Sequence, residues 1–248
     1  MDVTPGLIIK ETPASMAAAA ADIFAGVSKK SIHERGFFAA ALSGGSTPRA
    51  AYRILGEEPY LSQISWAAVH LFWVDERCVP ADSPASNYGA AKKDFLEKIP
   101  VPDSQAHPMP GEKPPEEGAL LYEKELKAFF QPTQSGFPAF DLIFLGAGKD
   151  GHTASLFPGR PVPAEKKRWV AAVKGGDPDL DRLTLTLPVL NQARQVVFLV
   201  SGEGKAAMVR AVFENKQAKL PVQMINPKDA KTTWLLDRPA ASMLSGST

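Results

Sequence analysis

The chain has 248 residues, of which 44% are hydrophobic and 22% are charged, a balance typical of a globular protein. Its 28 Lys and Arg against 27 Asp and Glu leave a net charge of +1, so no partner nucleic acid is expected. A single cysteine excludes a disulfide framework and a cysteine-rich zinc site. No apolar run reaches the roughly 18 residues of a membrane span, and the alanine run at 16–21 lacks a basic leader, so a cytoplasmic protein is expected.

Apolar runs of strand length alternate with helical patterns along the chain. Strands are expected at 7–9, 37–42, 69–74, 142–145, 169–173, 196–200 and 232–236. Helices are expected at 14–28, 49–55, 88–98, 115–130 and 204–214, with a loop over 100–115. This alternation predicts an α/β fold with a mostly parallel sheet covered by helices on both faces. One domain is expected over residues 1–239, followed by a frayed tail at 240–248.

Two helix starts have recognisable caps. Thr12 and Pro13 suit the N-cap and the first turn of the first helix. Thr47 and Pro48 suit the same positions in the second helix.

The turn before that second helix is rich in glycine. It contains Gly44, Gly45, Ser46 and Thr47, directly after an apolar strand. Backbone amides that glycines leave bare at a helix N-terminus form an anion site, usually for phosphate. A tight turn that binds nothing fits the same letters, and the ending of a Walker loop is missing.

The strand expected at 69–74 ends in three ionisable residues, Asp75, Glu76 and Arg77. Such residues are poor core material, so they indicate either a site or a surface salt-bridge cluster. Asp75 could act as a base or an orienting group, and the planar fork of Arg77 suits a phosphate or carboxylate. Cys78 follows, and a lone cysteine is more often a small buried apolar residue than a nucleophile.

The strand expected at 142–145 runs into a turn that carries Asp150 and His152. Ligands of α/β proteins lie at the carboxyl ends of strands, so a histidine presented there is a candidate catalytic base. The glycines of the turn also fit the spacing of a dinucleotide-binding loop. That loop needs a long helix and a later acidic residue, whereas Pro158 and Gly159 break the chain soon after the turn. No nucleotide cofactor is therefore expected.

Two further cations stand near the ends of strands. Arg182 opens an alternating, strand-like segment, and Lys205 follows a glycine-containing turn at the start of a helix. Each could add charge to a phosphate held by the glycine loop, although each taken alone is more typical of a solvated surface cation. His33, His70 and His107 lack metal-ligand spacing, with His33 expected in a surface loop and His70 packed in a strand, so no metal site is expected.

Taken together these motifs resemble the 6-phosphogluconolactonases of the glucosamine-6-phosphate isomerase/6-phosphogluconolactonase family. The matching segments lie at 43–48, 72–80, 86–89, 150–159 and 182–186, in order and over most of the chain. The resemblance implies a modified Rossmann-like sheet without a nucleotide, and no metal or organic cofactor. It also implies hydrolysis of 6-phospho-D-glucono-1,5-lactone to 6-phosphogluconate in the oxidative pentose phosphate pathway.

The residues suggest roles in that chemistry. His152 would activate water, while the glycine loop, Arg77, Arg182 and Lys205 would hold the phosphate. Asp75 and Asp150 are both candidates to orient the imidazole, and the amides of 146–151 are candidate oxyanion donors.

Three other functions fit parts of the pattern. The related deaminases carry an acidic residue five positions after the histidine, where this chain has Phe157. A non-catalytic sugar-phosphate sensor would keep the anion site alone. A thiol hydrolase would depend on Cys78, and no sequence feature assigns an oligomeric state.

Overall fold

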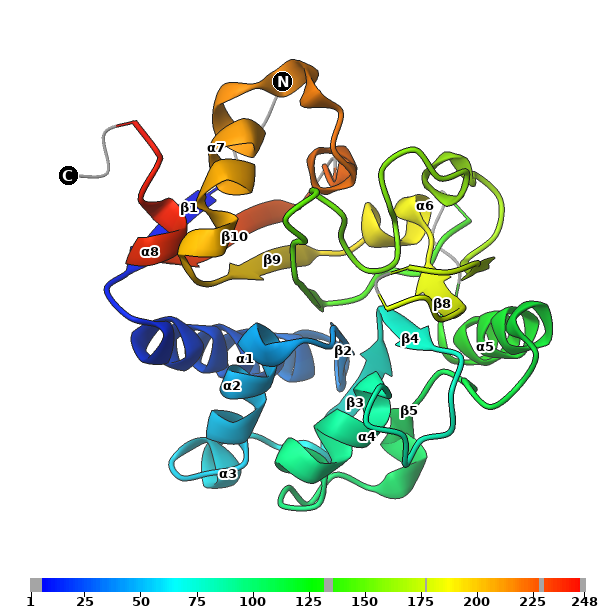
Figure 1. Ribbon diagram of the computed structural model, residues 1–248. Helices are drawn as coiled ribbons and strands as arrows, with labels where there is room; N and C mark the ends of the chain where they lie inside the picture. The colour runs from blue at the N-terminus through cyan, green and yellow to red at the C-terminus, as the bar shows by residue number, and fades with distance from the viewer. Residues whose placement is uncertain (1–5, 132–135, 177, 228–229, 246–248) are drawn as a thin grey trace.

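A parallel sheet of seven strands forms the centre of the computed structural model, which describes residues 6–131, 136–176, 178–227 and 230–245 (Figure 1). Every neighbouring pair in this sheet is parallel, so the carboxyl ends of its strands lie at one edge. The strand order is β1 (Gly6–Lys10), β10 (Lys231–Asp237), β9 (Gln195–Val200), β6 (Leu142–Leu145), β2 (Phe38–Leu42), β3 (Val69–Trp73) and β5 (Ala106–His107).

Helices flank the sheet, as the alternating pattern predicts. They are α1 (Pro13–Arg35), α2 (Ser46–Leu55), α3 (Tyr60–Gln63), α4 (Asn87–Ala91), α5 (Pro115–Phe129), α6 (Leu187–Leu190), α7 (Ala206–Glu214) and α8 (Arg238–Ala241). Single turns are η1 (Trp66–Ala68), η2 (Lys92–Leu96), η3 (Asp103–Gln105), η4 (Val162–Ala164), η5 (Glu203–Lys205), η6 (Lys216–Ala218) and η7 (Pro221–Met224). The α/β fold class is confirmed. No helix in the described ranges has both the length and the apolar character needed to span a bilayer.

A second, antiparallel sheet stands beside the first. It contains β4 (Asp75–Arg77), β8 (Arg182–Leu185) and β7 (Val170–Val173), in that order. The chain passes from one sheet to the other at Val74, whose N–H donates to Leu42 and whose carbonyl accepts from Leu185. The strand expected at 169–173 therefore belongs to this smaller sheet, and Asp75–Arg77 is itself a strand.

The helix caps follow the sequence at one start and differ at the other. Thr12 caps α1 as predicted, and α1 continues to Arg35, which places His33 on its last turn and not in a loop. Gly45 is the N-cap of α2, so the prediction of Thr47 at that position is wrong. Gly45 has φ of 93°, a conformation that glycine adopts without strain, and this lets the helix begin at Ser46.

Three other predicted segments differ in extent. The helix expected at 88–98 is α4 followed by the π-helical turn η2. The loop expected at 100–115 contains η3 and β5. Fraying is expected from residue 240, but Ala240 and Ala241 are buried in α8 and Ser245 donates to Glu214; residues 246–248 lie outside the described residues. The single domain over 1–239 stays a prediction, which the parallel pairing of β1 with β10 supports.

Asp237 anchors the end of β10 to the end of β9. Its buried carboxylate caps α8 through the amide of Ala240 at 2.8 Å and accepts from Ser201 and from the amide of Gly202. Asp237→Ala would leave these buried and partly buried donors without their acceptor. We expect the free energy of unfolding to fall by about 2–4 kcal/mol in chemical denaturation. Asp103→Ala, at an exposed carboxylate, is the control and is expected to change stability by less than about 0.5 kcal/mol. Equal losses in the two variants would contradict this role.

His70 gives the fold a pH dependence. It contacts His107, Nδ1 to Nε2 at 3.1 Å, beside the rings of Phe37 and Phe129. Burial, and then the neighbouring His107, lower the pKa of His70. The unfolded chain, in which a histidine titrates near 6.5, then takes up the proton first, so this part of the stability is lost as pH falls through about 6.5. We expect wild type to lose more free energy of unfolding than His70→Gln between about pH 7.5 and about pH 5.5. Parallel losses in chemical denaturation would refute this.

Candidate active site

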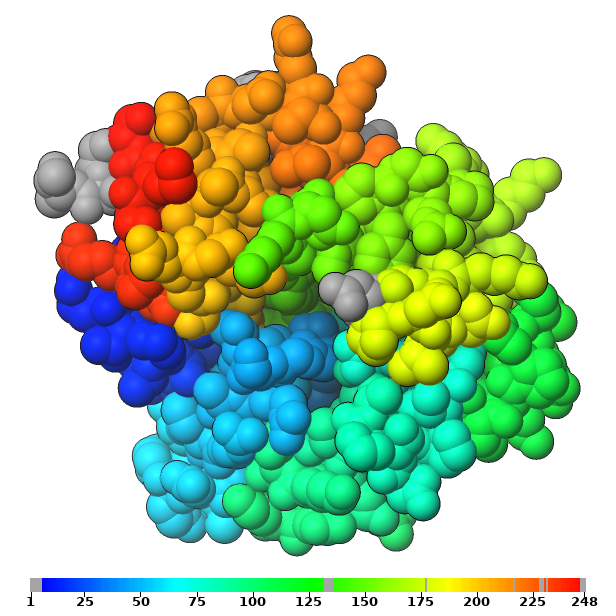
Figure 2. All heavy atoms as spheres, viewed as in Figure 1, coloured from blue at the N-terminus to red at the C-terminus, as the bar shows by residue number. Residues whose placement is uncertain are grey.

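A cavity of about 230 Å³ lies where the carboxyl ends of β2, β6 and β9 meet the second sheet. Figure 2 shows the front face hollowed between the blue, green and yellow segments of the chain. Its walls include nine of the predicted site residues: Gly44, Gly45, Ser46, Thr47, Asp75, Arg77, His152, Arg182 and Lys205. Asp150, the tenth, stands behind His152. Residues from five separate segments of the sequence therefore converge on one cavity.

The glycine loop is held in place by residues on two sides. The buried hydroxyl of Tyr52 donates to the carbonyl of Ser43 at 2.9 Å. A Cβ atom on Gly44 would lie 1.8 Å from Oδ1 of Asn87, so no larger residue fits there without movement of the loop. The loop thus presents its backbone to the cavity at the start of α2, the arrangement that suits an anion.

The three ionisable residues of β4 point to different partners. The carboxylate of Asp75 accepts from Ser155 Oγ at 2.7 Å and from Nδ2 of Asn87 at 3.3 Å. Glu76 accepts from the amides of residues 77, 87 and 88, and it thereby fixes the loop before α4. Burial raises the pKa of Glu76 despite these hydrogen bonds. Arg77 donates through Nη1 to the carbonyl of Ala85 at 2.7 Å and lines the cavity.

His152 and Asp150 form a close pair. Nδ1 of His152 lies 2.6 Å from Oδ1 of Asp150, and the amide of His152 donates to the same oxygen at 3.2 Å. Burial alone raises the pKa of Asp150, but the amide and imidazole of His152 outweigh it and hold that pKa below its usual value. Asp75 makes its contacts elsewhere, so Asp150 is the carboxylate that touches the imidazole.

The turn between Gly146 and Gly151 uses some of its own amides. Gly148 donates to the carbonyl of His152 at 2.8 Å, and Gly151 donates to the carbonyl of Gly148 at 3.0 Å. These two N–H groups serve the turn itself and are poor candidates for oxyanion donors. A Cβ at Gly148 would lie 2.1 Å from Nδ1 of His152, so glycine is required for the imidazole to reach this position.

Arg182 and Lys205 reach the cavity from different elements, β8 and η5. Arg182 is 3% exposed and donates through Nη2 to the carbonyl of Pro178 at 3.2 Å. Lys205 donates through Nζ to the carbonyl of Ala147 at 2.7 Å. Burial, followed by the charge of Lys149, lowers the pKa of Lys205. A cation that is partly desolvated binds an anion more strongly than one in open water.

The remaining reactive residues lie apart from this cavity. Cys78 lines a different surface depression, and burial raises the pKa of its thiol to about 11, the opposite of what a nucleophilic thiolate needs. His70 and His107 contact each other at the far end of β3 and β5, as the packed-strand prediction for His70 requires. Within the described ranges, no set of three or more His, Cys, Asp or Glu side chains could hold a metal ion.

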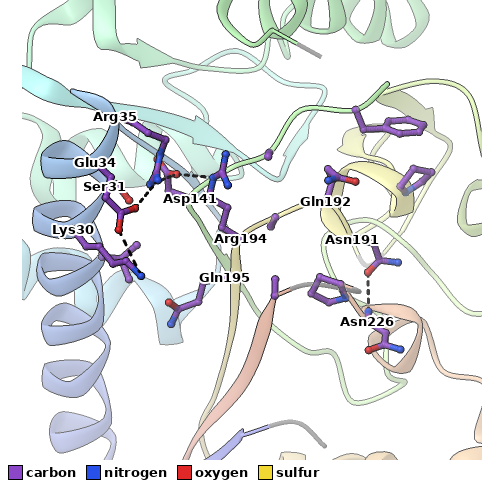
Figure 3. Close-up of a pocket in the computed structure, with 17 residues that line it drawn as sticks. Lys30, Ser31, Glu34, Arg35, Asp141, Asn191, Gln192, Arg194, Gln195 and Asn226 are labelled. Atoms are coloured by element: carbon purple, nitrogen blue, oxygen red, sulfur yellow. Dashed lines mark hydrogen bonds and ion pairs between the residues drawn. The ribbon is translucent and has the colours of Figure 1, made fainter. Parts of the chain in front are cut away.

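A larger cavity, of about 1070 Å³, lies at the opposite edge of the sheet (Figure 3). Its charged groups bind one another: Asp141 accepts from Arg35 at 2.9 Å and lies 3.4 Å from Nε of Arg194. Asp141 also accepts from the amide of Ala39 at 2.9 Å, which ties α1 to the start of β2. These contacts give the cluster a structural role, whereas the smaller cavity holds the candidate catalytic residues.

Two partners of Asp75 could not be identified from single segments of the sequence. Asn87 and Ser155 both bind the carboxylate of Asp75, yet neither follows a strand directly. Asn87 falls in a short motif, 86–89, that only the family resemblance singled out. Ser155 lies within the 150–159 motif, where Asp150 and His152 drew attention first.

Comparison with known proteins gives a consistent result. The model of the family described as glucosamine-6-phosphate isomerases/6-phosphogluconolactonase matches residues 11–234. A rat protein named 6-phosphogluconolactonase is 40% identical over 247 residues, which cover 97% of this chain and 95% of that protein. A rice protein named "Probable 6-phosphogluconolactonase 3, chloroplastic" is 41% identical over 249 residues, 96% of this chain and 76% of that protein.

The fold agrees with these sequence relationships. The solved structure of 6-phosphogluconolactonase from Trypanosoma brucei superposes with a TM-score of 0.88 at 29% identity. The superposition covers 98% of this chain and 99% of the other. The chain therefore belongs to the glucosamine-6-phosphate isomerase/6-phosphogluconolactonase family.

Proposed function

We propose that this protein hydrolyses 6-phospho-D-glucono-1,5-lactone to 6-phosphogluconate, the lactone hydrolysis of the oxidative pentose phosphate pathway. The observation that carries the proposal is the hydrogen-bonded His152–Asp150 pair beside a cavity that also presents Arg77, Arg182 and Lys205. A base and three cations around one cavity match a substrate with a reactive carbonyl and a phosphate. Relatives named for this activity support it.

His152 acts as the general base in this proposal. Asp150 accepts a hydrogen bond from the protonated Nδ1 of the imidazole, which leaves Nε2 free to take a proton from water. The low pKa of Asp150 keeps its carboxylate ionised at neutral pH, so it also stabilises the imidazolium that forms. Asp75 holds Ser155 and Asn87 instead and shapes the cavity wall.

The glycine loop and the three cations hold the phosphate. The amides at the start of α2 and the guanidinium groups of Arg77 and Arg182 supply directional donors, and Lys205 supplies a point charge. Holding the phosphate fixes the lactone carbonyl relative to His152, which replaces an encounter in solution by a reaction within one complex.

One imidazole both accepts and returns the proton in this reaction. Water attacks the carbonyl carbon as His152 takes its proton, giving a tetrahedral oxyanion. The bond from that carbon to the ring oxygen then breaks, and the imidazolium returns the proton to the ring oxygen. The new carboxylic acid ionises, so each turnover releases one proton to the solvent.

Two alternative functions are less well supported. A deaminase of the related type would need an acid where Phe157 stands, and a phenyl ring cannot transfer a proton. A sugar-phosphate sensor would not need the His152–Asp150 pair.

A cytoplasmic location stays a prediction. Rice relatives at 41% identity are named chloroplastic, so family membership is compatible with more than one compartment.

Loss of the base gives the first test. We expect His152→Ala to lower turnover by about 10²–10⁴, the usual contribution of a general base. The measurement is proton release after addition of freshly prepared lactone, with the spontaneous rate subtracted. His33→Ala, on the exposed last turn of α1, is the control and is expected to match wild type. A loss below about threefold in the His152 variant would exclude it as the base.

Loss of a phosphate contact should affect binding more than turnover. We expect Lys205→Ala and Arg182→Lys to raise KM about tenfold or more and to change kcat by less than about threefold, because these contacts persist from substrate to transition state. Lys124→Ala, at an exposed position on α5, is the control. A defect confined to kcat in steady-state kinetics would contradict the assignment.

A further inference from the structure

One aromatic ring contacts both the candidate base and one of the candidate phosphate-binding cations. The ring of Phe157 lies 4.9 Å from the imidazole of His152, centroid to centroid, with the planes tilted by 45°. The guanidinium carbon of Arg182 lies 5.4 Å from the centre of the same ring. Phe157 is not among the residues that line the cavity, but it contacts both the base and the cation.

A folded-back loop brings the ring to this position. Phe157 follows His152 by five residues, and an extended chain would carry it well away. Instead Ala154 adopts φ of 47°, a left-handed conformation that is uncommon for a residue with a Cβ. The amide of Leu156 then donates to the carbonyl of Thr153 at 2.9 Å, which closes the turn.

Hydrogen bonds on three sides keep this turn closed. Thr153 Oγ1 donates to the carbonyl of Gly146 at 2.8 Å, and Ser155 Oγ donates to Asp75 at 2.7 Å. The amide of Ser155 donates to Thr184 in β8 at 3.2 Å, and the side chain of Leu156 is fully buried. A strained residue persists only where its surroundings over-determine it, so the position of Phe157 is fixed by both sheets.

Arg182 is fixed on its other side as well. The carbonyl of Pro178 accepts from Nη2, and Gly176 lies so close to the guanidinium that a Cβ atom there would come within 2.6 Å of Nε. The negative face of a phenyl ring attracts a guanidinium without neutralising its charge. The same ring attracts an imidazolium, the form that His152 takes when it has accepted a proton.

We propose that Phe157 is a positioning residue that holds the base His152 and the phosphate-binding Arg182 in one fixed relation. This role rests on the proposed lactone hydrolysis. The ring couples the place where the phosphate is held to the place where water is activated, and it touches no substrate. Misplacement of either end would therefore appear in both kinetic constants, unlike the loss of a phosphate contact alone.

Two substitutions test the role of the ring, one that removes it and one that keeps it. Phe157→Leu keeps an apolar side chain without a π face, and Phe157→Tyr keeps the ring. We expect Phe157→Leu to lower kcat/KM by about 3- to 30-fold, with kcat reduced and KM raised together. Phe157→Tyr is expected to stay within about twofold of wild type. Phe37→Leu is the matched control, because it makes the same change at a ring that packs on Phe129 at the opposite edge of the sheet.

Thermal unfolding of each variant shows whether it is folded at the assay temperature. Should Phe157→Leu be unfolded there, Phe157→Met is subject to the same expectation. Three results would each overturn the proposal. They are wild-type kinetics in a folded Phe157→Leu, a defect in that variant confined to kcat or to KM, and an equal loss of kcat/KM in Phe157→Tyr. Phe37→Leu with the same kinetic defect would overturn it too. A wild type no faster than spontaneous hydrolysis would instead refute the proposed function, and this role with it.

Discussion

The parallel direction of the seven central strands is the constraint on which the site depends. Strands β2, β6 and β9 are apolar along nearly their whole length because both of their faces are buried. Such strands have no exposed face for polar side chains, so the polar residues that follow them gather at one edge. Parallel pairing brings the glycine loop, the His152 turn and the Lys205 turn to that edge together. The same direction leaves Asp141 and its arginine partners at the other edge, where they join helix to sheet.

The small antiparallel sheet adds what the parallel sheet cannot supply. Arg77 and Arg182 are direct partners in the register of β4 and β8, so two cations stand side by side. Like charges opposite each other are unfavourable in a sheet, and a bound phosphate would relieve that repulsion. Each guanidinium donates to a main-chain carbonyl, that of Ala85 for Arg77 and that of Pro178 for Arg182, and these hydrogen bonds help to fix its position. At the opposite edge Arg35 binds the carboxylate of Asp141.

Local pattern predicted most of the strands, but not β4, whose residues were expected to follow a strand, or β5, which lies in the expected loop. Glycine, serine and threonine after an apolar strand predict an anion loop because bare amides at a helix start follow from those letters. The exact cap did not follow, since it depends on the positive φ that Gly45 adopts in the folded loop. The sequence also left Asp75 and Asp150 undecided as partners of His152. Asp150 contacts the imidazole within a single turn, whereas the position of Asp75 depends on how the two sheets meet at Val74, which no single segment encodes.

The same limit applies to Phe157, which the sequence marks only as a residue without the carboxyl group of the related deaminases. Five residues after a histidine, a phenylalanine differs from the acid of the related deaminases, and the sequence alone assigns it no further part. Its contacts appear only once Ala154 turns the chain back and β8 delivers Arg182 from across the second sheet. An acid at that place would add a proton-transfer group beside His152. A ring there instead leaves proton transfer to the His152–Asp150 pair and stabilises the cations around it. Phenylalanine at position 157 therefore excludes the proton transfer that a deaminase needs there, and its ring supports the arrangement of His152 and Arg182 that lactone hydrolysis requires.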